Sequence, residues 1–133
     1  MQQKIQLRKK YLNLRKKKYY DVNKEFFLPL LKLIRSRSKK KLLNIGFYYP
    51  SSFEVNVLKF LELNNILLHN ILLPVIDKKN LMNFFSWWKN DVLFVNQYGI
   101  PEPSKSKVKI PDVILVPILA FDKNKYRLGY GKG

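Results

Sequence analysis

The stretch from Arg127 to Gly133 (RLGYGKG) combines the residue types best suited to chemistry on a small ligand. Its three glycines stand at alternate positions, which lets backbone N–H groups approach an anion closely. Arg127 and Lys132 add positive charge beside them, and the combination suits a phosphate group. The spacing is neither that of a Walker A motif nor that of the dinucleotide-binding fingerprint. By composition alone, a glycine-rich basic stretch is also typical of a flexible terminus, so both interpretations stay open here.

Glu54 is the second candidate. It is the only acidic residue between Glu25 and Glu62, and it follows an apolar run and the turn Pro50-Ser51-Ser52. In parallel α/β folds, ligands bind beyond the carboxyl ends of the strands, where a carboxylate can hold a polar group of a substrate. The alternative is a glutamate in the first turn of a helix, favoured there by the helix dipole.

Five other residues could bind a ligand or a metal, but we expect structural roles for them. Asp112 and Asp122 flank the last apolar strand and could bind a metal, but turn formation is favoured for both. Trp87 and Trp88 could stack on a flat ring, but one residue of such a pair in an apolar run usually belongs to the core. His69, in ILLHNILL, is expected to be a buried histidine with its hydrogen bonds satisfied.

The charge is large and uneven. The chain has 26 Lys and Arg against 9 Asp and Glu, and residues 1–41 alone hold 15 basic and 2 acidic residues. Such a field attracts polyanions. A lysine-rich composition explains the total but explains less well its concentration at one end. A basic module that binds nucleic acid is therefore an alternative, with tyrosines as stacking groups at positions 11, 19 and 20.

Composition also excludes several classes of protein. Without cysteine there are no disulfides, thiolate metal sites or cysteine nucleophiles, and a single histidine excludes a His-rich metal cluster. No apolar run approaches the roughly 18 residues of a membrane span. The basic N-terminal stretch has no apolar segment typical of a secretory signal, so we expect a cytoplasmic protein without a membrane partner.

The pattern of apolar residues predicts alternating helices and strands. We expect Asp21 to cap the second helix, Pro29 to kink or break it, and Lys89-Asn90 to form a hairpin turn. The predicted helices span 2–18, 21–36 and 52–64, the predicted strands span 42–49, 66–76, 81–88, 91–96 and 113–117, and 99–109 is a predicted loop. This order favours an α/β fold with a mainly parallel sheet.

Taken in order, several segments resemble the motifs of the 5-formyltetrahydrofolate cyclo-ligase family. The segments are Lys4-Ile-Gln-Leu-Arg8, Ile45-Gly-Phe-Tyr-Tyr-Pro50 with Glu54-Val55 after it, Leu73-Pro74, Leu81-Met-Asn-Phe84, Asn96-Gln-Tyr-Gly-Ile-Pro-Glu-Pro103, Pro111-Asp-Val-Ile-Leu-Val-Pro117, Ala120-Phe-Asp122 and Arg127 to Gly133. Single pieces are weak signals, but the ordered set covers nearly the whole chain and is specific.

The resemblance implies an ATP- and Mg²⁺-dependent enzyme that converts 5-formyltetrahydrofolate to 5,10-methenyltetrahydrofolate, releasing ADP and phosphate. It implies catalytic roles for Arg127 and Lys132. It implies that ATP is bound by Lys4, Arg8, Arg127, Leu128, Gly129, Tyr130, Gly131, Lys132 and Gly133. It implies that the folate is bound by Tyr49, Glu54, Tyr130, Gly131 and Lys132. No metal ligand is assigned within the chain.

The family motif continues beyond the glycine stretch, so we expect residues 1–133 to form a single but incomplete domain that lacks its C-terminal part. The expected fold is a three-layer Rossmann-like sandwich preceded by N-terminal helices. We expect a monomer whose partners are small molecules rather than nucleic acid. An inactive, truncated member of the family is the remaining alternative.

Overall fold

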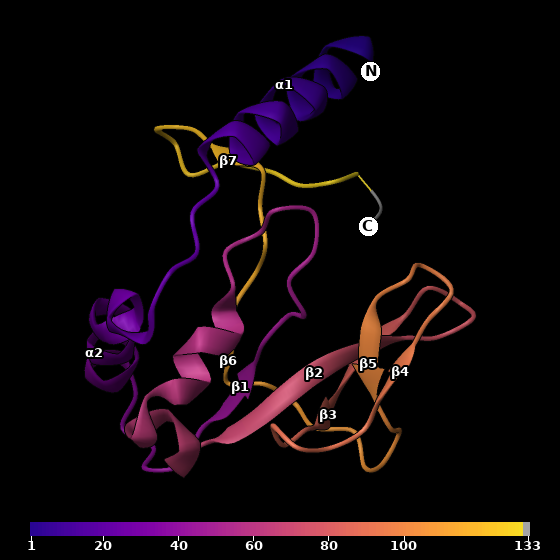
Figure 1. Ribbon diagram of the computed structural model, residues 1–133. Helices are drawn as coiled ribbons and strands as arrows, with labels where there is room; N and C mark the ends of the chain where they lie inside the picture. Colours follow the sequence, from indigo (N-terminus) through magenta and orange to yellow (C-terminus); the bar gives the residue numbers. More distant parts are fainter. Residues whose placement is uncertain (132–133) are drawn as a thin grey trace.

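The computed structural model describes residues 1–131, which form helices on a small, mostly parallel sheet (Figure 1). The helical elements, of which η denotes a 3₁₀ helix, are α1 (Gln2–Lys18), η1 (Lys24–Phe27), α2 (Leu28–Arg37), η2 (Val57–Glu62) and η3 (Asn64–Leu68). The strands are β1 (Asn44–Gly46), β2 (Asn70–Ile76), β3 (Met82–Ser86), β4 (Leu93–Val95), β5 (Pro101–Pro103), β6 (Val113–Ile114), β7 (Ala120–Phe121) and β8 (Arg127–Leu128). The α/β class with a mainly parallel sheet is confirmed.

The central sheet has the strand order β3-β2-β1-β6. Strand β1 pairs parallel with both β2 and β6, whereas β3 pairs antiparallel with β2. Parallel strands are buried on both faces, and most residues of β1 and β2 are accordingly buried. The carboxyl end of β1 leads directly into the loop that carries Tyr48 and Glu54.

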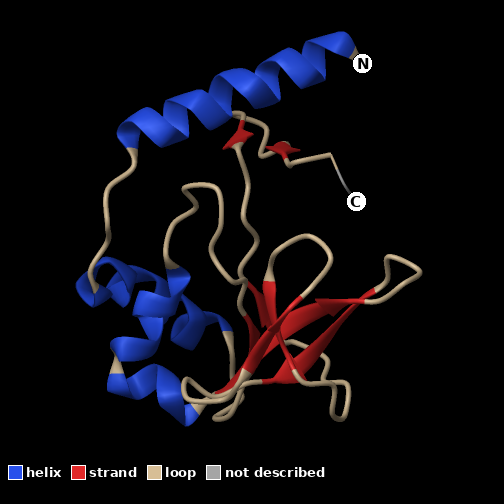
Figure 2. Ribbon diagram, turned by 45° about the vertical axis from the view of Figure 1, so that its right-hand side comes forward, coloured by secondary structure: helices blue, strands red, loops and turns tan. Residues whose placement is uncertain are grey.

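The core lies where α2 and the 3₁₀ helices pack on one side of the sheet (Figure 2). Phe27 of η1 stacks on Phe60 of η2 with ring centroids 5.2 Å apart, and Phe60 in turn contacts Phe47. Phe47 and Phe60 are both almost fully buried. These aromatic contacts fix the helices against β1, which sets the direction in which the loop after β1 leaves the sheet.

Helix α1 stands apart from this core. It crosses the molecule beside β7, and an extended linker joins it to the α2 region (Figures 1 and 2). None of its residues is buried, and its half-buried positions include Arg8, Tyr11 and Arg15. No helix formed by residues 1–131 combines the length and the apolar character that a membrane crossing requires.

Several sequence expectations about elements were wrong. Asn23, not Asp21, caps η1, by accepting a hydrogen bond from the Phe26 N–H at 3.2 Å. The expected break at Pro29 was confirmed. Pro29 stands in the first turn of α2, where a backbone N–H has no partner within the helix. The predicted helix over 52–64 is only the 3₁₀ helix η2, since Ser52 and Phe53 take left-handed conformations with φ of 49° and 60°.

The strand pairings were also mispredicted. Lys89-Asn90 joins no hairpin, because β3 pairs with β2 and β4 pairs with β5. Strand β5 falls within the segment 99–109 that was predicted to be a loop. Proline has no N–H to donate to a strand ladder, so the PEP sequence of β5 is typical of a loop. It can form a strand here because both strands of a two-stranded sheet are edge strands.

Candidate functional site

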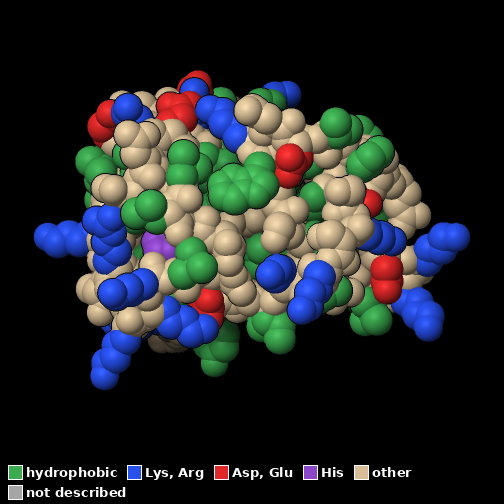
Figure 3. All heavy atoms as spheres, turned by 90° about the horizontal axis from the view of Figure 1, so that it is seen from below, with side chains coloured by type: hydrophobic (Ala, Val, Ile, Leu, Met, Phe, Trp, Pro, Cys, Tyr) green, Lys and Arg blue, Asp and Glu red, His purple; other side chains and the backbone are tan. Residues whose placement is uncertain are grey.

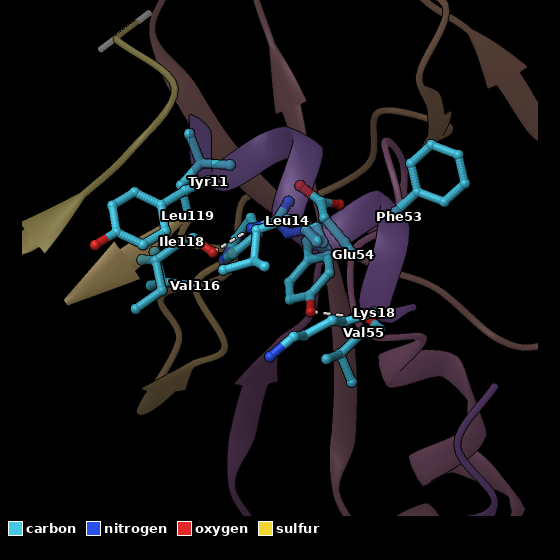
Figure 4. Close-up of a pocket in the computed structure, with 12 residues that line it drawn as sticks. Tyr11, Leu14, Lys18, Phe53, Glu54, Val55, Val116, Ile118 and Leu119 are labelled. Atoms are coloured by element: carbon cyan, nitrogen blue, oxygen red, sulfur yellow. Dashed lines mark hydrogen bonds between the residues drawn. The ribbon is translucent and has the colours of Figure 1, made fainter. Parts of the chain in front are cut away.

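A cavity of about 390 Å³ opens between α1 and the carboxyl end of β1. Its walls come from three segments that are distant in the sequence (Figure 4). Helix α1 contributes Tyr11, Leu14, Arg15 and Lys18, the loop after β1 contributes Tyr48, Phe53, Glu54 and Val55, and the segment after β6 contributes Val116, Pro117, Ile118 and Leu119. The cavity therefore exists only once α1 has docked against the body of the protein.

Glu54 is a buried carboxylate in this cavity wall, only 7% exposed. Its Oε2 accepts a hydrogen bond from the Ser51 N–H at 2.8 Å, and its Oε1 accepts one from the Tyr130 hydroxyl at 2.5 Å. A carboxylate has about four lone-pair sites, so two remain for donors of a ligand. Glu54 does not begin a helix, and the alternative of a helix first-turn glutamate was wrong.

Tyr130 links the carboxylate to α1. Its hydroxyl donates to Glu54 and accepts from a guanidinium nitrogen of Arg15, and the Arg15 guanidinium carbon lies 5.6 Å from the centre of the Tyr130 ring. Arg15 also donates to the carbonyl of Ile118. Burial and the hydrogen bond to Glu54 raise the pKa of Tyr130 to about 12, so the phenol stays protonated and remains a donor near neutral pH.

Tyr48 lies beside this cluster and donates its hydroxyl to the carbonyl of Val55 at 2.9 Å. Burial, and then the negative charge of Glu54, raises the pKa of Tyr48 well above its usual range, while Arg15 acts in the opposite direction. The two tyrosines thus supply neutral hydroxyls, and Arg15 and Lys18 supply positive charge around a single carboxylate. Such a cavity suits a ligand that is both polar and anionic.

The glycine stretch contacts α1 through Arg8. The Arg8 Nε donates to the carbonyl of Gly129 at 3.0 Å, across 121 positions of sequence. Gly131 has φ of +84°, and a Cβ there would lie 2.6 Å from the guanidinium carbon of Arg8. The left-handed conformation favours glycine at position 131, and a side chain there would also displace the guanidinium of Arg8.

The structure brings together Arg8, Glu54, Gly129, Tyr130 and Gly131 from the sites expected from sequence. Leu128 holds this stretch in place, because its carbonyl accepts a hydrogen bond from the Leu119 N–H at 2.8 Å. Lys4 and Arg127 are exposed and make no side-chain hydrogen bond or ion pair within residues 1–131. Lys132 and Gly133 lie outside the described residues.

Two cavity residues were missed. Tyr49 was expected to contact the substrate, but the cavity is lined by its neighbour Tyr48. Arg15 was seen only as one charge among many. Helical spacing could have predicted Arg15 as a site residue, because it follows Arg8 by seven positions and therefore lies on the same face of α1.

The other candidates have structural roles. His69 is buried and its Nδ1 accepts a hydrogen bond from the Leu43 N–H, as expected. Asp122 organises the β7–β8 turn by accepting from the N–H groups of residues 124 and 126. Trp87 is buried and Trp88 exposed. Within residues 1–131, no group of three or more acidic or histidine side chains is placed to hold a metal ion.

Comparison with known proteins gives a consistent result. A model of the 5-formyltetrahydrofolate cyclo-ligase family matches residues 1–133. The 5-formyltetrahydrofolate cyclo-ligase of Haemophilus influenzae is 29% identical over 110 residues, which cover 77% of this chain and 57% of that protein. A probable 5-formyltetrahydrofolate cyclo-ligase of Schizosaccharomyces pombe is 35% identical over 71 residues, which cover 48% of this chain and 35% of that protein. The chain thus spans little more than half the length of one curated relative and about a third of the other.

Two solved structures share the fold. The 5,10-methenyltetrahydrofolate synthetase of Aquifex aeolicus superposes with a TM-score of 0.68 at 29% identity, covering 98% of this chain and 68% of that one. The 5,10-methenyltetrahydrofolate synthetase of Mycoplasma pneumoniae gives a TM-score of 0.63 at 24% identity, covering 98% and 73%. With the family match over the full sequence and the ordered motifs, these similarities show that the chain belongs to the 5-formyltetrahydrofolate cyclo-ligase family.

Proposed function

We propose that this chain catalyses the ATP-dependent cyclisation of 5-formyltetrahydrofolate to 5,10-methenyltetrahydrofolate. The observation that carries the proposal is the convergence of Arg15, Tyr130 and Glu54 in one hydrogen-bonded cluster beside the cavity. In the proposed reaction, ATP phosphorylates the formyl oxygen, N10 attacks the activated carbon, and phosphate leaves as the ring closes. No protein nucleophile is needed, which fits a site without cysteine or a nearby histidine.

Glu54 is the proposed contact for the pterin part of the folate. Its two unused lone-pair sites can accept N–H groups, and its burial strengthens each such hydrogen bond. The Tyr130 hydroxyl and the Ser51 N–H hold the carboxylate in one orientation. Tyr49 is proposed as a further neighbour of the substrate on the same loop.

The phosphates of ATP are proposed to lie between α1 and the glycine stretch. Phosphoryl transfer depends mainly on positioning and on neutralising charge, both of which cationic side chains and backbone donors can supply. Arg8 already lies against Gly131, and Lys4 is one helical turn away from Arg8. Arg127 and Lys132 are proposed to contact the phosphoryl group that is transferred.

Mg²⁺ is proposed to enter with ATP. This ion keeps several of its waters and usually binds through phosphate oxygens and one or two carboxylates rather than through a protein cage. The residues described here, which include no cluster of three or more acidic or histidine side chains, are compatible with that mode of binding. We further propose that the protein acts in the cytoplasm, as a monomer.

The test is turnover by the purified 133-residue chain with 5-formyltetrahydrofolate, ATP and Mg²⁺, followed by the absorbance of the methenyl product. Glu54→Gln keeps the shape of the side chain but removes its charge, so turnover is expected to fall by about 10- to 100-fold. Glu62→Gln is the matched control, since Glu62 is an exposed carboxylate paired with Lys59 at 3.2 Å, away from the cavity. Absence of product from a folded wild-type chain would contradict the proposed activity and favour an inactive member of the family.

A second candidate function is favoured by α1. This helix carries eight Lys and Arg residues and buries none of its side chains, so most of its charge is available to a polyanion. If α1 binds nucleic acid, affinity for an oligonucleotide will fall steeply with salt, and Glu54→Gln will leave it unchanged. Salt-dependent oligonucleotide binding in a chain without turnover would favour this function over the first.

A further inference from the structure

A second cavity, of about 220 Å³, lies at the opposite end of the sheet, where β1 and β2 begin. It lies between the carboxyl end of α2, the linker that follows α2, and the segment just before β2. Among the side chains that line it are Arg35, Ser38, Lys41 and His69. Because Tyr48 and Glu54 follow the carboxyl end of β1, the two cavities are separated by the length of the strand.

The walls of this cavity carry uncompensated positive charge. Arg35 and Lys41 have no acidic side chain within ion-pair distance among residues 1–131. Lys40 also lines the cavity, but its ammonium is held by Asp112 at 2.6 Å. The carboxyl end of α2 adds about half a negative charge, which the two full positive charges outweigh.

His69 supplies a directed donor. Its side chain is 8% exposed, and its Nδ1 accepts a hydrogen bond from the Leu43 N–H at 3.1 Å. In the neutral imidazole the proton must then be on Nε2, which has no hydrogen-bond partner among the described residues. Figure 3 shows the imidazole reaching the surface among Lys and Arg side chains.

Ser38 supplies a second donor. Its Oγ accepts a hydrogen bond from the Lys40 N–H at 3.2 Å, which leaves the hydroxyl proton free for a ligand. Charged groups and N–H or O–H donors therefore reach the cavity from three segments of the chain. A flat carboxylate offers two acceptor oxygens, whereas a phosphate group offers three or four in a tetrahedral arrangement and carries up to two charges.

We propose that this cavity is a binding site for a phosphate group, either inorganic phosphate or the phosphate of a small phosphorylated metabolite. Arg35 and Lys41 neutralise the anion, and the His69 Nε2–H and the Ser38 hydroxyl orient it. The site is independent of the proposed cyclisation, which uses the other end of the sheet.

The pKa of His69 depends on the charges around it, so the imidazole can report phosphate binding by NMR. Burial, and then the positive charge of Arg35, lowers the pKa of His69. A bound phosphate offsets the charge of Arg35 and stabilises the imidazolium, so binding raises the pKa of His69. Asp112 is already paired with Lys40 at 2.6 Å, and Arg35 is the charged side chain that lowers the pKa of His69.

The experiment is an NMR titration of the full chain with inorganic phosphate, at a fixed pH near the ordinary histidine pKa of about 6.5 and at constant ionic strength. His69 is the only histidine, so the imidazole Hε1 resonance is unambiguous. We expect saturable movement of this resonance toward its imidazolium position. Arg35→Gln and Lys41→Gln are each expected to weaken the apparent affinity by about tenfold.

Lys32→Gln is the matched control, because Lys32 is exposed on α2 and does not line the cavity. It should leave the affinity unchanged. Glycerol phosphate distinguishes the two sources of the phosphate group, since tighter binding than that of inorganic phosphate indicates a phosphorylated metabolite. An equal response to chloride or acetate, or an equal response in wild type and in both cavity variants, would overturn the proposal.

Discussion

At the residue scale, the environment of Tyr130 decides which protonation state the site can use. The phenol is both a donor to Glu54 and an acceptor from Arg15, and this pairing requires the neutral form. Ionisation would place a phenolate against the Glu54 carboxylate in a partly buried position. The hydrogen bonds of the neutral Tyr130 phenol are therefore part of what holds α1 to the loop after β1, and the raised pKa of Tyr130 keeps the phenol neutral.

This coupling predicts a pH dependence of stability. The folded-state pKa of Tyr130, about 12, lies above the ordinary tyrosine value of about 10. Between these values the unfolded chain binds fewer protons than the folded one, so the contribution of Tyr130 is complete below pH 10 and is lost as the pH rises through about 12. The difference in unfolding free energy between wild type and Tyr130→Phe should shrink over this interval, measured by urea unfolding at several pH values.

The control for this measurement is Tyr126→Phe. Tyr126 stands in the β7–β8 hairpin, four positions before Tyr130, but is 74% exposed, and its hydroxyl has no hydrogen bond among residues 1–131. The same subtraction with Tyr126→Phe should give a difference that does not change with pH. A constant difference for Tyr130→Phe as well would contradict the role assigned to its hydroxyl.

At the scale of elements, the site depends on contact between α1 and the glycine stretch. Gly129 and Gly131 provide a matched pair for testing this contact, because they are two positions apart and differ in environment. A Cβ at position 129 would meet nothing within 4 Å. A Cβ at position 131 would meet the Arg8 guanidinium, and the backbone there has a φ of +84°, which residues other than glycine rarely adopt. Only the second substitution should disturb how α1 and this stretch meet.

Gly131→Ala is expected to weaken ATP binding by about tenfold, because alanine in the left-handed region costs roughly 1–2 kcal/mol and Arg8 must also move. Gly129→Ala should weaken ATP binding less than Gly131→Ala does, since a Cβ there meets nothing within 4 Å and the Gly129 carbonyl can still accept from Arg8. Calorimetric titration with ATP and Mg²⁺ measures both dissociation constants. Equal affinities would show that the Arg8–Gly131 approach is not part of the ATP site.

At the scale of the whole molecule, the chain consists of a packed core and a docked helix. The core holds the buried apolar residues from Val22 to Trp87, whereas α1 buries none of its own. Its attachment therefore depends on polar contacts, chiefly those of Arg8 with Gly129 and of Arg15 with Tyr130 and Ile118. Elements with few buried apolar contacts open at low free-energy cost.

Hydrogen exchange tests this division. Amides of α1 are expected to exchange faster than those of β2, whose Leu72 and Leu73 are fully buried. Arg15→Ala should lower the protection of α1 several-fold further without changing β2, because it removes contacts to two segments. Lys17→Ala, an exposed substitution on the same helix, should change neither. Equal protection of α1 and β2 in the wild type would show that they open as a single unit.

The sequence by itself determined the features that depend on short stretches of chain. The periodicity of residues 2–18 predicted α1 with its observed bounds, and Pro29 marked the break before α2. Apolar runs predicted strands at β1, β2 and β6, and their alternation with helices predicted the mainly parallel sheet. These signals are local, because helix spacing and proline geometry act within a few residues.

Only the tertiary structure decided which distant segments meet. Strand β3 could have paired with β4 through a local turn, but it pairs with β2, and β4 pairs with β5. Arg15 was one of many lysines and arginines until folding placed it against Tyr130, 115 positions away. Tyr48 rather than Tyr49 lines the cavity because successive side chains of an extended segment point in opposite directions, and packing selects which one faces inward. Contacts across such separations reflect the free energy of the complete fold, which no local pattern of residues specifies.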